Sequence, residues 1–273
     1  MCLNPQTKYS YMTYESQYDD AMLEGMQSAY GQGFLSPGGA EEVAGIVAGI
    51  DLAGRDVLDI GCGVGGAVIL LAGELGAGRV VGVDVEEVSL ARARRAVEAA
   101  GLADRVSLRL VAPGPIPFPE DSFDVVFSKD VFCHLPEKGP LFAESFRSLR
   151  PGGIFACGDW IEAKHLPPSA GFDEWSERLR AGGLMFHFGS PAEYADGLAA
   201  AGFEAVEARD NSSRAEGKAR RELDRSMGAD RNAMRERLGE AGYENRLNLT
   251  RARYEALAGG RLLHHHIQAR KPA

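Results

Sequence analysis

The chain has 273 residues, 45% of them hydrophobic, and a net charge of −9, which suits one large α/β domain or one domain with a sizeable insertion. No apolar run reaches the roughly 18 residues of a membrane span, and residues 1–18 lack the apolar stretch of a signal peptide, so we expect a cytoplasmic protein without a membrane partner. The acidic balance argues against a nucleic-acid partner, because there is no excess of cations to release counterions from a phosphate backbone.

The N-terminal region, residues 1–50, is predicted to form a helical lid. Residues 1–35 are polar, rich in tyrosine and compatible with helices, and residues 36–39 (Ser-Pro-Gly-Gly) give a turn signal. Residues 40–50 follow with the pattern of an amphipathic helix.

Short apolar strands alternate with helices from Asp56 onward. The predicted strands are 57–60, 80–84, 106–111, 123–127 and 154–159, and the predicted helices are 65–75, 88–100 and 141–149. The Pro-Gly-Gly sequence at 151–153 is a clear stop after the last of these helices. Such alternation predicts βαβ units, and therefore an α/β fold with a Rossmann-like, mostly parallel sheet flanked by helices.

The last third of the chain has a different pattern. A helix at 192–201 and a strand at 203–208 precede a charged helical stretch at 213–258, and a final strand is expected at 262–269. With this strand the sheet is seven-stranded and carries a helical insertion before its last strand. The predicted domains are the lid 1–50, the core 51–212, the insertion 213–260 and the final strand of the core 261–273.

A glycine-rich turn carries the most information about function. Gly61, Gly63 and Gly66 match G-x-G-x-x-G between a strand and a helix, where glycines allow a tight turn and close approach of a ligand to the backbone. Asp84 ends the next strand, where a carboxylate can accept hydrogen bonds from both ribose hydroxyls of an adenosine. Dinucleotide-binding enzymes share both features.

Asp59 decides between the adenosine cofactors. A dinucleotide fold places a pyrophosphate at this helix N-terminus, and a carboxylate two residues before the first glycine would repel it. S-adenosylmethionine has no phosphate and carries an ammonium and a sulfonium, which a nearby carboxylate favours. The residues therefore predict S-adenosylmethionine as the cofactor, with S-adenosylhomocysteine as the product.

Several segments resemble known methyltransferases. The string Val-Leu-Asp-Ile-Gly-Cys-Gly at 57–63 resembles motif I of class I S-adenosylmethionine-dependent methyltransferases, and further segments agree in order at 82–84, 118–124 and 149–153. Within that class, most of the region 15–205 resembles the phosphoethanolamine N-methyltransferase family. The segments that carry this likeness are 17–18, 30–31, 34–39, 128–130 and 133–135.

The resemblance implies a role for particular residues. Tyr18 and His134 correspond to a catalytic pair whose tyrosine sits on an N-terminal lid, Ser36 to a serine that contacts the cofactor, and Asp130 to an aspartate near the substrate amine. Ala112 stands where the family has an aspartate for the adenine amine, so backbone groups there would take that part. The expected cofactor-binding residues are Leu35, Ser36, Asp59, Gly61, Gly63, Asp84, Val85, Ala112 and Lys129.

Asp130 and His134 follow the fourth predicted strand and are four residues apart. In a helix both would face the same way, at the carboxyl edge of the sheet where ligands bind. An amine must be neutral to attack a methyl carbon, and a histidine with a pKa of about 6.5 can accept its proton. The alternative is that His134 only packs under a loop.

The chain departs from the family where the phosphate is bound. Trp160, Leu184 and Phe186 fall near the family's phosphate-binding tyrosines and arginine, which argues against phosphoethanolamine itself, whereas Arg253 falls near a family lysine and can bind an anion. Trp160, Phe186 and Phe188 suit a cation–π box, or else ordinary core packing. The expected substrate-binding residues are Asp130, Trp160, Phe186 and Arg253.

Cysteines and histidines do not predict a metal site. Cys2, Cys62, Cys133 and Cys157 have no metal-type spacing and are expected to be reduced thiols. Residues 264–266 are three consecutive histidines, which the alternating faces of a strand would separate.

The predicted reaction is direct transfer of a methyl group to a small soluble metabolite, most simply to the nitrogen of an amine. The residues leave open S-methylation of a thioether such as methionine, O- or C-methylation of a secondary metabolite, and a non-catalytic cofactor-binding protein. A homodimer is possible. The sequence leaves open whether residues 213–258 close the pocket as a lid or build a dimer interface.

Overall fold

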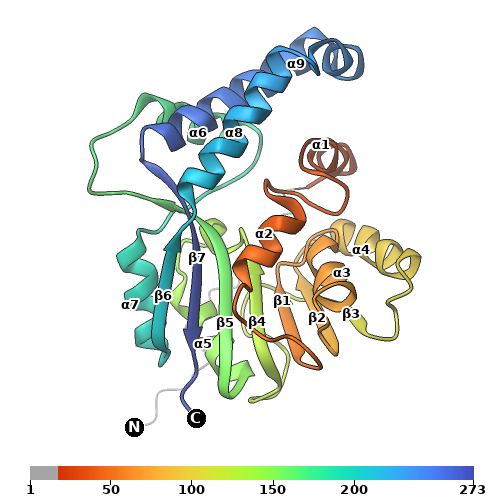
Figure 1. The fold of residues 1–273 in the computed structure, drawn as a ribbon, viewed down its shortest axis with the longest axis vertical. Coiled ribbons are helices and arrows are strands. Elements are labelled where there is room, and N and C mark those ends of the chain that lie inside the picture. The colour runs from red at the N-terminus through yellow and green to blue at the C-terminus, as the bar shows by residue number, and fades with distance from the viewer. Residues whose placement is uncertain (1–17) are drawn as a thin grey trace.

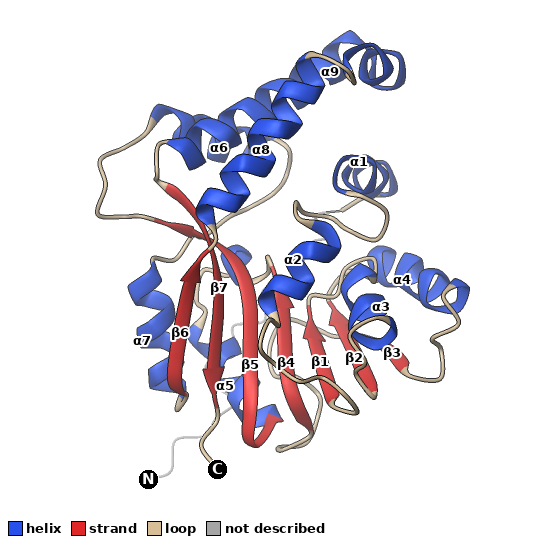
Figure 2. Ribbon diagram, in the orientation of Figure 1, coloured by secondary structure: helices blue, strands red, loops and turns tan. Residues whose placement is uncertain are grey.

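The computed structural model describes residues 18–273; Cys2, Gln17 and the first part of the predicted lid lie outside the described residues. One sheet runs through the molecule in the order β3-β2-β1-β4-β5-β7-β6 (Figure 2). Its strands are β1 Asp56–Ile60, β2 Arg79–Asp84, β3 Val106–Leu110, β4 Phe123–Lys129, β5 Leu149–Glu162, β6 Glu204–Asp210 and β7 Leu262–Arg270. Because β7 alone is antiparallel to its neighbours β5 and β6, the predicted mostly parallel, seven-stranded sheet is confirmed.

Helices cover both faces of the sheet. On one face α2 (Gly39–Ile46), α3 (Gly66–Gly73) and α4 (Glu87–Ala99) pack on the strands, and on the other lie α5 (Gly139–Ser148) and α7 (Pro191–Ala201) (Figure 1). The central strands are apolar in consecutive positions because both of their faces are covered: Val57 and Leu58 are each 0% exposed but belong to different core clusters.

A second group of helices stands above the carboxyl edge of the parallel strands. It consists of α6 (Ala170–Ala181), α8 (Ser212–Met227) and α9 (Arg231–Ala258), with α1 (Asp20–Tyr30) nearby (Figure 1). The segment between β6 and β7 is therefore helical, and Gly239, with a φ of 69°, kinks α9.

Two elements differ from the sequence expectation. The helix α6 is new; Ser169 caps its N-terminus, and Phe172, Trp175 and Leu179 form its buried face. The strand β5 begins at Leu149 and ends at Glu162, so it extends beyond both ends of the predicted strand 154–159. Its pairing with β7, which runs from Ile154 to Glu162, accounts for the later end.

No helix within residues 18–273 is both long enough and apolar enough to span a bilayer. Cys62, Cys133 and Cys157 are buried and free.

Candidate active site

The glycine-rich turn links β1 to α3 and leaves no room for side chains. Gly61 has a φ of +74°, and a Cβ there would lie 2.3 Å from Val131 Cγ2. A Cβ on Gly66 would lie 2.3 Å from the carbonyl oxygen of Gly33. The sequence needs glycine here because two other loops, before α2 and after β4, close onto the turn.

Asp84, at the end of β2, stabilises this turn by hydrogen bonding. Its Oδ2 accepts a hydrogen bond from Gly63 N at 2.7 Å, and its Oδ1 accepts one from Glu86 N at 2.9 Å. Burial raises the pKa of the Asp84 carboxyl. Each carboxylate oxygen has a further lone pair, so Asp84 can still accept ribose hydroxyls.

Asp59 presents an unsatisfied carboxylate oxygen to the site. The residue is 1% exposed, and within the described chain its Oδ2 has no hydrogen-bond partner. Burial, reinforced by the charge of Asp84, raises the pKa of Asp59 to about 8. A buried carboxyl of this kind fits a cationic ligand such as the ammonium of S-adenosylmethionine, which would supply the missing hydrogen bond and stabilise the ionised form of Asp59.

Cofactor binding is expected to release a proton from Asp59. At pH 7 a carboxyl with a pKa of about 8 is mostly protonated, and a bound ammonium favours its ionised form. Affinity for S-adenosylmethionine should therefore rise as the pH is raised from 6 toward 8. Calorimetry in two buffers of different ionisation enthalpy measures how many protons are released on binding. The Asp59→Asn variant has no carboxyl to ionise, so any release that it still shows comes from the ligand. Equal release by parent and variant would contradict this role.

The loop before α2 lies against the glycine turn and carries two more of the expected cofactor residues. A Cβ on Gly63 would lie 3.3 Å from Leu35 Cδ1, so Leu35 packs on the turn. Lys129 Nζ donates a hydrogen bond to Ser36 Oγ and pairs with Asp130 Oδ2 at 2.7 Å. The structure thus brings Leu35, Ser36 and Lys129 to the same edge as the glycines.

Val85 and Ala112 lie farther along that edge. Val85 follows Asp84 directly and is partly buried, and Ala112 is exposed in the loop beyond β3. Their contact with the cofactor stays a prediction.

The expectation that Asp130 and His134 share one helical face is wrong. Asp130 has a φ of +56°, and only a short 3₁₀ turn forms over Phe132–His134. The positive φ turns the chain after β4, where Asp130 N donates to Gly158 O at 2.8 Å. As a result the two side chains have different partners.

Asp130 is engaged in a buried ion network. Its oxygens lie 2.7 Å from Lys129 Nζ and 3.2 Å from His264 Nε2. Burial would raise the pKa of Asp130, but the charges and hydrogen bonds of Lys129 and His264 outweigh it and lower the pKa. Asp130 is therefore an ionised carboxylate.

His134 has the ring orientation of a base. Its Nδ1 lies 2.8 Å from Met185 O, and because a carbonyl oxygen only accepts, the neutral ring carries its proton on Nδ1. Its Nε2 is then the acceptor. Burial lowers the pKa of His134, so the ring is neutral at pH 7.

Asp159, which the sequence expectation missed, anchors the turn that carries His134. Its Oδ2 accepts hydrogen bonds from Cys133 N at 3.0 Å and from Tyr194 Oη at 2.8 Å. Burial, with the charge of Asp130, raises the pKa of Asp159 to about 6. A charged residue inside the apolar run 154–161 was the signal available in the sequence.

Tyr18 packs on the cluster that contains Cys133 and Phe186. Burial, and then the charge of Asp84, raises its pKa, so the hydroxyl stays protonated and can act only as a hydrogen-bond donor or acceptor at neutral pH. This fits a partner to His134 rather than a second base.

A cavity of about 340 Å³ lies between α1, α2, α8 and α9. Trp160, Arg253 and His264 line it, together with Tyr30 and Glu222. Arg253 is 5% exposed; it pairs with Glu222, and its Nη1 lies 3.4 Å from Tyr30 Oη. Two of the expected substrate residues, Trp160 and Arg253, are thus brought to one cavity.

Phe186 belongs to an aromatic stack instead. Its ring lies 5.1 Å from that of Phe188, 5.9 Å from that of Trp175 and 4.3 Å from that of His134. Trp160 joins from the other side, 6.0 Å from Trp175. These rings pack mainly against each other, and Phe186 also packs against His134. Trp175 was missed by the sequence analysis because the helix α6 was not expected.

The sheet with its single antiparallel strand, the glycine turn and the acid at the end of β2 define a class I S-adenosylmethionine-dependent methyltransferase domain. Residues 58–157 match the family model described as "Methyltransferase domain". The chain therefore carries a domain of this family.

Within the family, the chain is similar to phosphoethanolamine N-methyltransferases. It is 33% identical over 212 residues to phosphoethanolamine N-methyltransferase 1 of Arabidopsis thaliana, covering 77% of this chain and 41% of that protein. A solved phosphoethanolamine N-methyltransferase 2 of Haemonchus contortus superposes with a TM-score of 0.84 at 24% identity, over 94% of this chain and 59% of that one. The chain thus spans less than two thirds of the length of either relative.

A shorter region is shared with other methyltransferases. Sterol 24-C-methyltransferase of Pneumocystis carinii is 35% identical over 108 residues, 40% of this chain and 28% of that protein. A match of this length does not discriminate between an acceptor nitrogen and an acceptor carbon.

Proposed function

We propose that this chain transfers a methyl group from S-adenosylmethionine to the nitrogen of a small amine. The observation that carries the proposal is the orientation of His134, whose Nδ1–H is held by Met185 O and whose Nε2 is left as a proton acceptor. The extended similarity to an amine methyltransferase of Arabidopsis thaliana supports the choice of nitrogen.

The residues of the chain would bind, orient and deprotonate the acceptor. S-adenosylmethionine, when bound, supplies an already activated methyl group, so catalysis rests mainly on holding the reacting atoms about 3 to 3.5 Å apart. His134 Nε2 removes the proton that the amine must lose, and the Tyr18 hydroxyl donates a hydrogen bond. The α1 helix and the helical insertion shield the reaction from water.

The charged groups at the cavity limit the chemical class of the methyl acceptor. Arg246 and Arg253 share one carboxylate, that of Glu222, so this group keeps one net positive charge, with Arg253 and Glu222 on the cavity wall. This supports an amine that also carries an acidic group, for which Arg253 is the anion-binding residue.

The test is methyl transfer from isotopically labelled S-adenosylmethionine to separate amines, amino acids, methionine and a catechol, with products identified by mass. We expect label on nitrogen, and a kcat/KM that falls at low pH as His134 becomes protonated. Label on sulfur with a flat pH profile, or on oxygen or carbon, would replace the proposal. Cofactor binding without any labelled product, even from a metabolite extract, would indicate a non-catalytic protein.

A further inference from the structure

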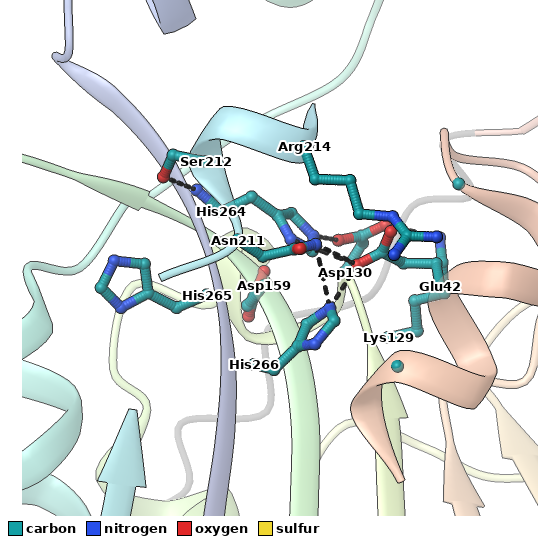
Figure 3. A network of polar contacts seen from close by, with 12 residues as sticks. Glu42, Lys129, Asp130, Asp159, Asn211, Ser212, Arg214, His264, His265 and His266 are labelled. Carbon is teal, nitrogen blue, oxygen red and sulfur yellow. Dashed lines mark hydrogen bonds and ion pairs between the residues drawn. The ribbon is translucent and has the colours of Figure 1, made fainter. Parts of the chain in front are cut away.

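Two of the three consecutive histidines meet a glutamate that lies far away in the sequence. On β7 the side chains alternate, so His264 and His266 point toward Glu42 of α2 while His265 points the other way (Figure 3). His264, His266 and Glu42 are 2%, 7% and 5% exposed. One potential ligand atom from each of the three lies within 4.8 Å of the others.

His264 leaves a lone pair without a partner. Its Nε2 lies 3.2 Å from Asp130 Oδ1, and because a carboxylate only accepts, the neutral ring carries its proton on Nε2. Its Nδ1 is then an acceptor, buried, and without a hydrogen-bond partner in the part of the chain that the structure describes. It faces Glu42 Oε1 at 3.5 Å, so in the neutral ring, which is the form that binds a metal, a nitrogen lone pair and a carboxylate oxygen are close together and buried.

His266 and Asn211 complete the surroundings of the same oxygen. His266 Nε2 is hydrogen-bonded to Glu42 Oε1, and Asn211 Nδ2 lies 2.8 Å from that oxygen and 3.1 Å from His266 Nε2. Both nitrogens are thus directed at Glu42 Oε1. An asparagine amide can turn about its χ2 bond, which would present Oδ1 in place of Nδ2.

We propose that Glu42 Oε1, His264 Nδ1 and His266 Nε2 form a binding site for a divalent transition-metal ion of the zinc type. Two imidazoles and one carboxylate are a donor set of catalytic zinc and of other transition metals, whereas Mg²⁺ and Ca²⁺ prefer all-oxygen sites. Ligands at about 2.0 to 2.1 Å from a tetrahedral zinc lie about 3.3 Å apart. The separation of 3.5 Å between Glu42 Oε1 and His264 Nδ1 needs little change. The hydrogen-bonded pair of Glu42 Oε1 and His266 Nε2 must open, and His266 releases its Nε2 proton to solvent when the ion binds.

In this site Asp130 would orient the ring of the metal ligand His264. A metal-bound histidine commonly donates its other N–H to a carboxylate, which fixes the ring, and His264 and Asp130 have this arrangement. The nearby lysines do not occupy the position between the ligands. Lys129 pairs with Asp130, and Lys218 lies 3.0 Å from Glu41 and 3.7 Å from the other oxygen of Glu42.

The site opens onto the cavity that contains Trp160 and Arg253. Glu42 and His264 both line it, so we expect a bound ion to be reachable by a small molecule in the cavity. With the three ligands Glu42, His264 and His266 a tetrahedral ion would keep one coordination position open, which Asn211 Oδ1 would fill if its amide turned toward the ion. The proposal does not depend on which acceptor is methylated.

The test is titration of metal-free, untagged protein with Co²⁺ and Zn²⁺, followed by visible absorption for Co²⁺ and calorimetry for Zn²⁺. We expect one ion per chain and the absorption bands of a low-coordinate Co²⁺ site. His266→Gln and Glu42→Gln should each weaken binding at least about tenfold, since loss of even an outer partner costs 10 to 100-fold. His265→Gln, on the same strand but on its opposite face, is the matched control and should bind like the parent.

The absence of binding by the parent would overturn the proposal, as would equal weakening by His265→Gln and His266→Gln. Far-UV circular dichroism and thermal unfolding of each metal-free variant check the fold. If His266→Gln does not fold, Glu42→Gln and His264→Gln take its place. A rise in Tm on adding Zn²⁺, present in the parent and in His265→Gln but lost in the ligand variants, is a readout that is independent of any methyl transfer.

Discussion

Replacing His134 by alanine is expected to lower kcat by about 10²- to 10⁴-fold, the range that a positioned general base contributes. The reason is the ring geometry: Met185 O holds the Nδ1 proton, and burial lowers the pKa, so Nε2 is free to take a proton from the acceptor at pH 7. Affinity for S-adenosylmethionine should change little, because the glycine turn and Asp84 belong to other elements. Single-turnover kinetics and calorimetry separate the two quantities.

His187→Ala is the matched control for this experiment. The His187 ring is exposed and directly follows Phe186 in the sequence. Its backbone N donates to Cys133 O, a contact that the change leaves in place. Its kcat should stay within about twofold of the parent, as for most surface substitutions. Unchanged turnover in His134→Ala would contradict the assignment of His134 as the base.

Glu222→Gln is expected to destabilise the protein by about 3 kcal/mol, because it leaves two arginines without their shared carboxylate. Glu222 Oε1 lies 2.6 Å from Arg246 Nη2, and its Oε2 pairs with Arg253. The side chains are 18% exposed for Glu222 and Arg246 and 6% for Arg253, so water screens these charges only weakly. The centre of the Tyr30 ring lies 4.9 Å from the guanidinium carbon of Arg246 and 5.8 Å from that of Arg253, so the ring stabilises both cations but neutralises neither charge.

The pH dependence of this effect has a definite sign. Burial would raise the pKa of Glu222, but the charges of Arg253 and Arg246 outweigh it and lower the pKa below the ordinary value of 4.5. The stabilisation is therefore complete above pH 4.5 and is lost as the pH falls through the folded-state pKa. In urea unfolding, the difference in the free energy of unfolding between the parent and Glu222→Gln should be smaller at acidic pH than at neutral pH.

Glu174→Gln controls for a generic loss of an ion pair. Glu174 pairs with Arg178 at 2.7 Å on the surface of α6, with 48% and 31% of these side chains exposed. Such a pair contributes less than about 0.5 kcal/mol. A Glu222→Gln variant no less stable than Glu174→Gln would show that the Glu222 carboxylate does not hold the arginines in place.

The sheet could be predicted because the pattern of its strands is local. Val57, Leu58, Val80 and Val81 are consecutive apolar pairs that only a strand covered on both faces explains, and turn residues mark their ends. The helix α6 was missed although Phe172, Trp175 and Leu179 have helical spacing, because Gly171 and the flanking loops weaken the signal.

The site divides in the same way. Gly61, Gly63 and Asp84 could be placed from a strand–turn–helix pattern, and the structure brings them together. The partners of Asp130 could not be predicted, because the positive φ of this one residue turns its side chain away from His134 and toward His264. Likewise, nothing local pairs Glu42 with His266, because only the completed sheet brings α2 and β7 into contact.

The position of β7 has a consequence for biosynthesis. This strand lies between β5 and β6 and is hydrogen-bonded to both, but it is translated after all the other strands of the sheet. While the ribosome is still making α8 and α9, the edges of β5 and β6 lack their shared neighbour and expose unpaired backbone groups. A chain stopped before Leu262 would therefore be a target for chaperones and for aggregation, and a nascent chain can close its sheet only after Arg270 has left the exit tunnel.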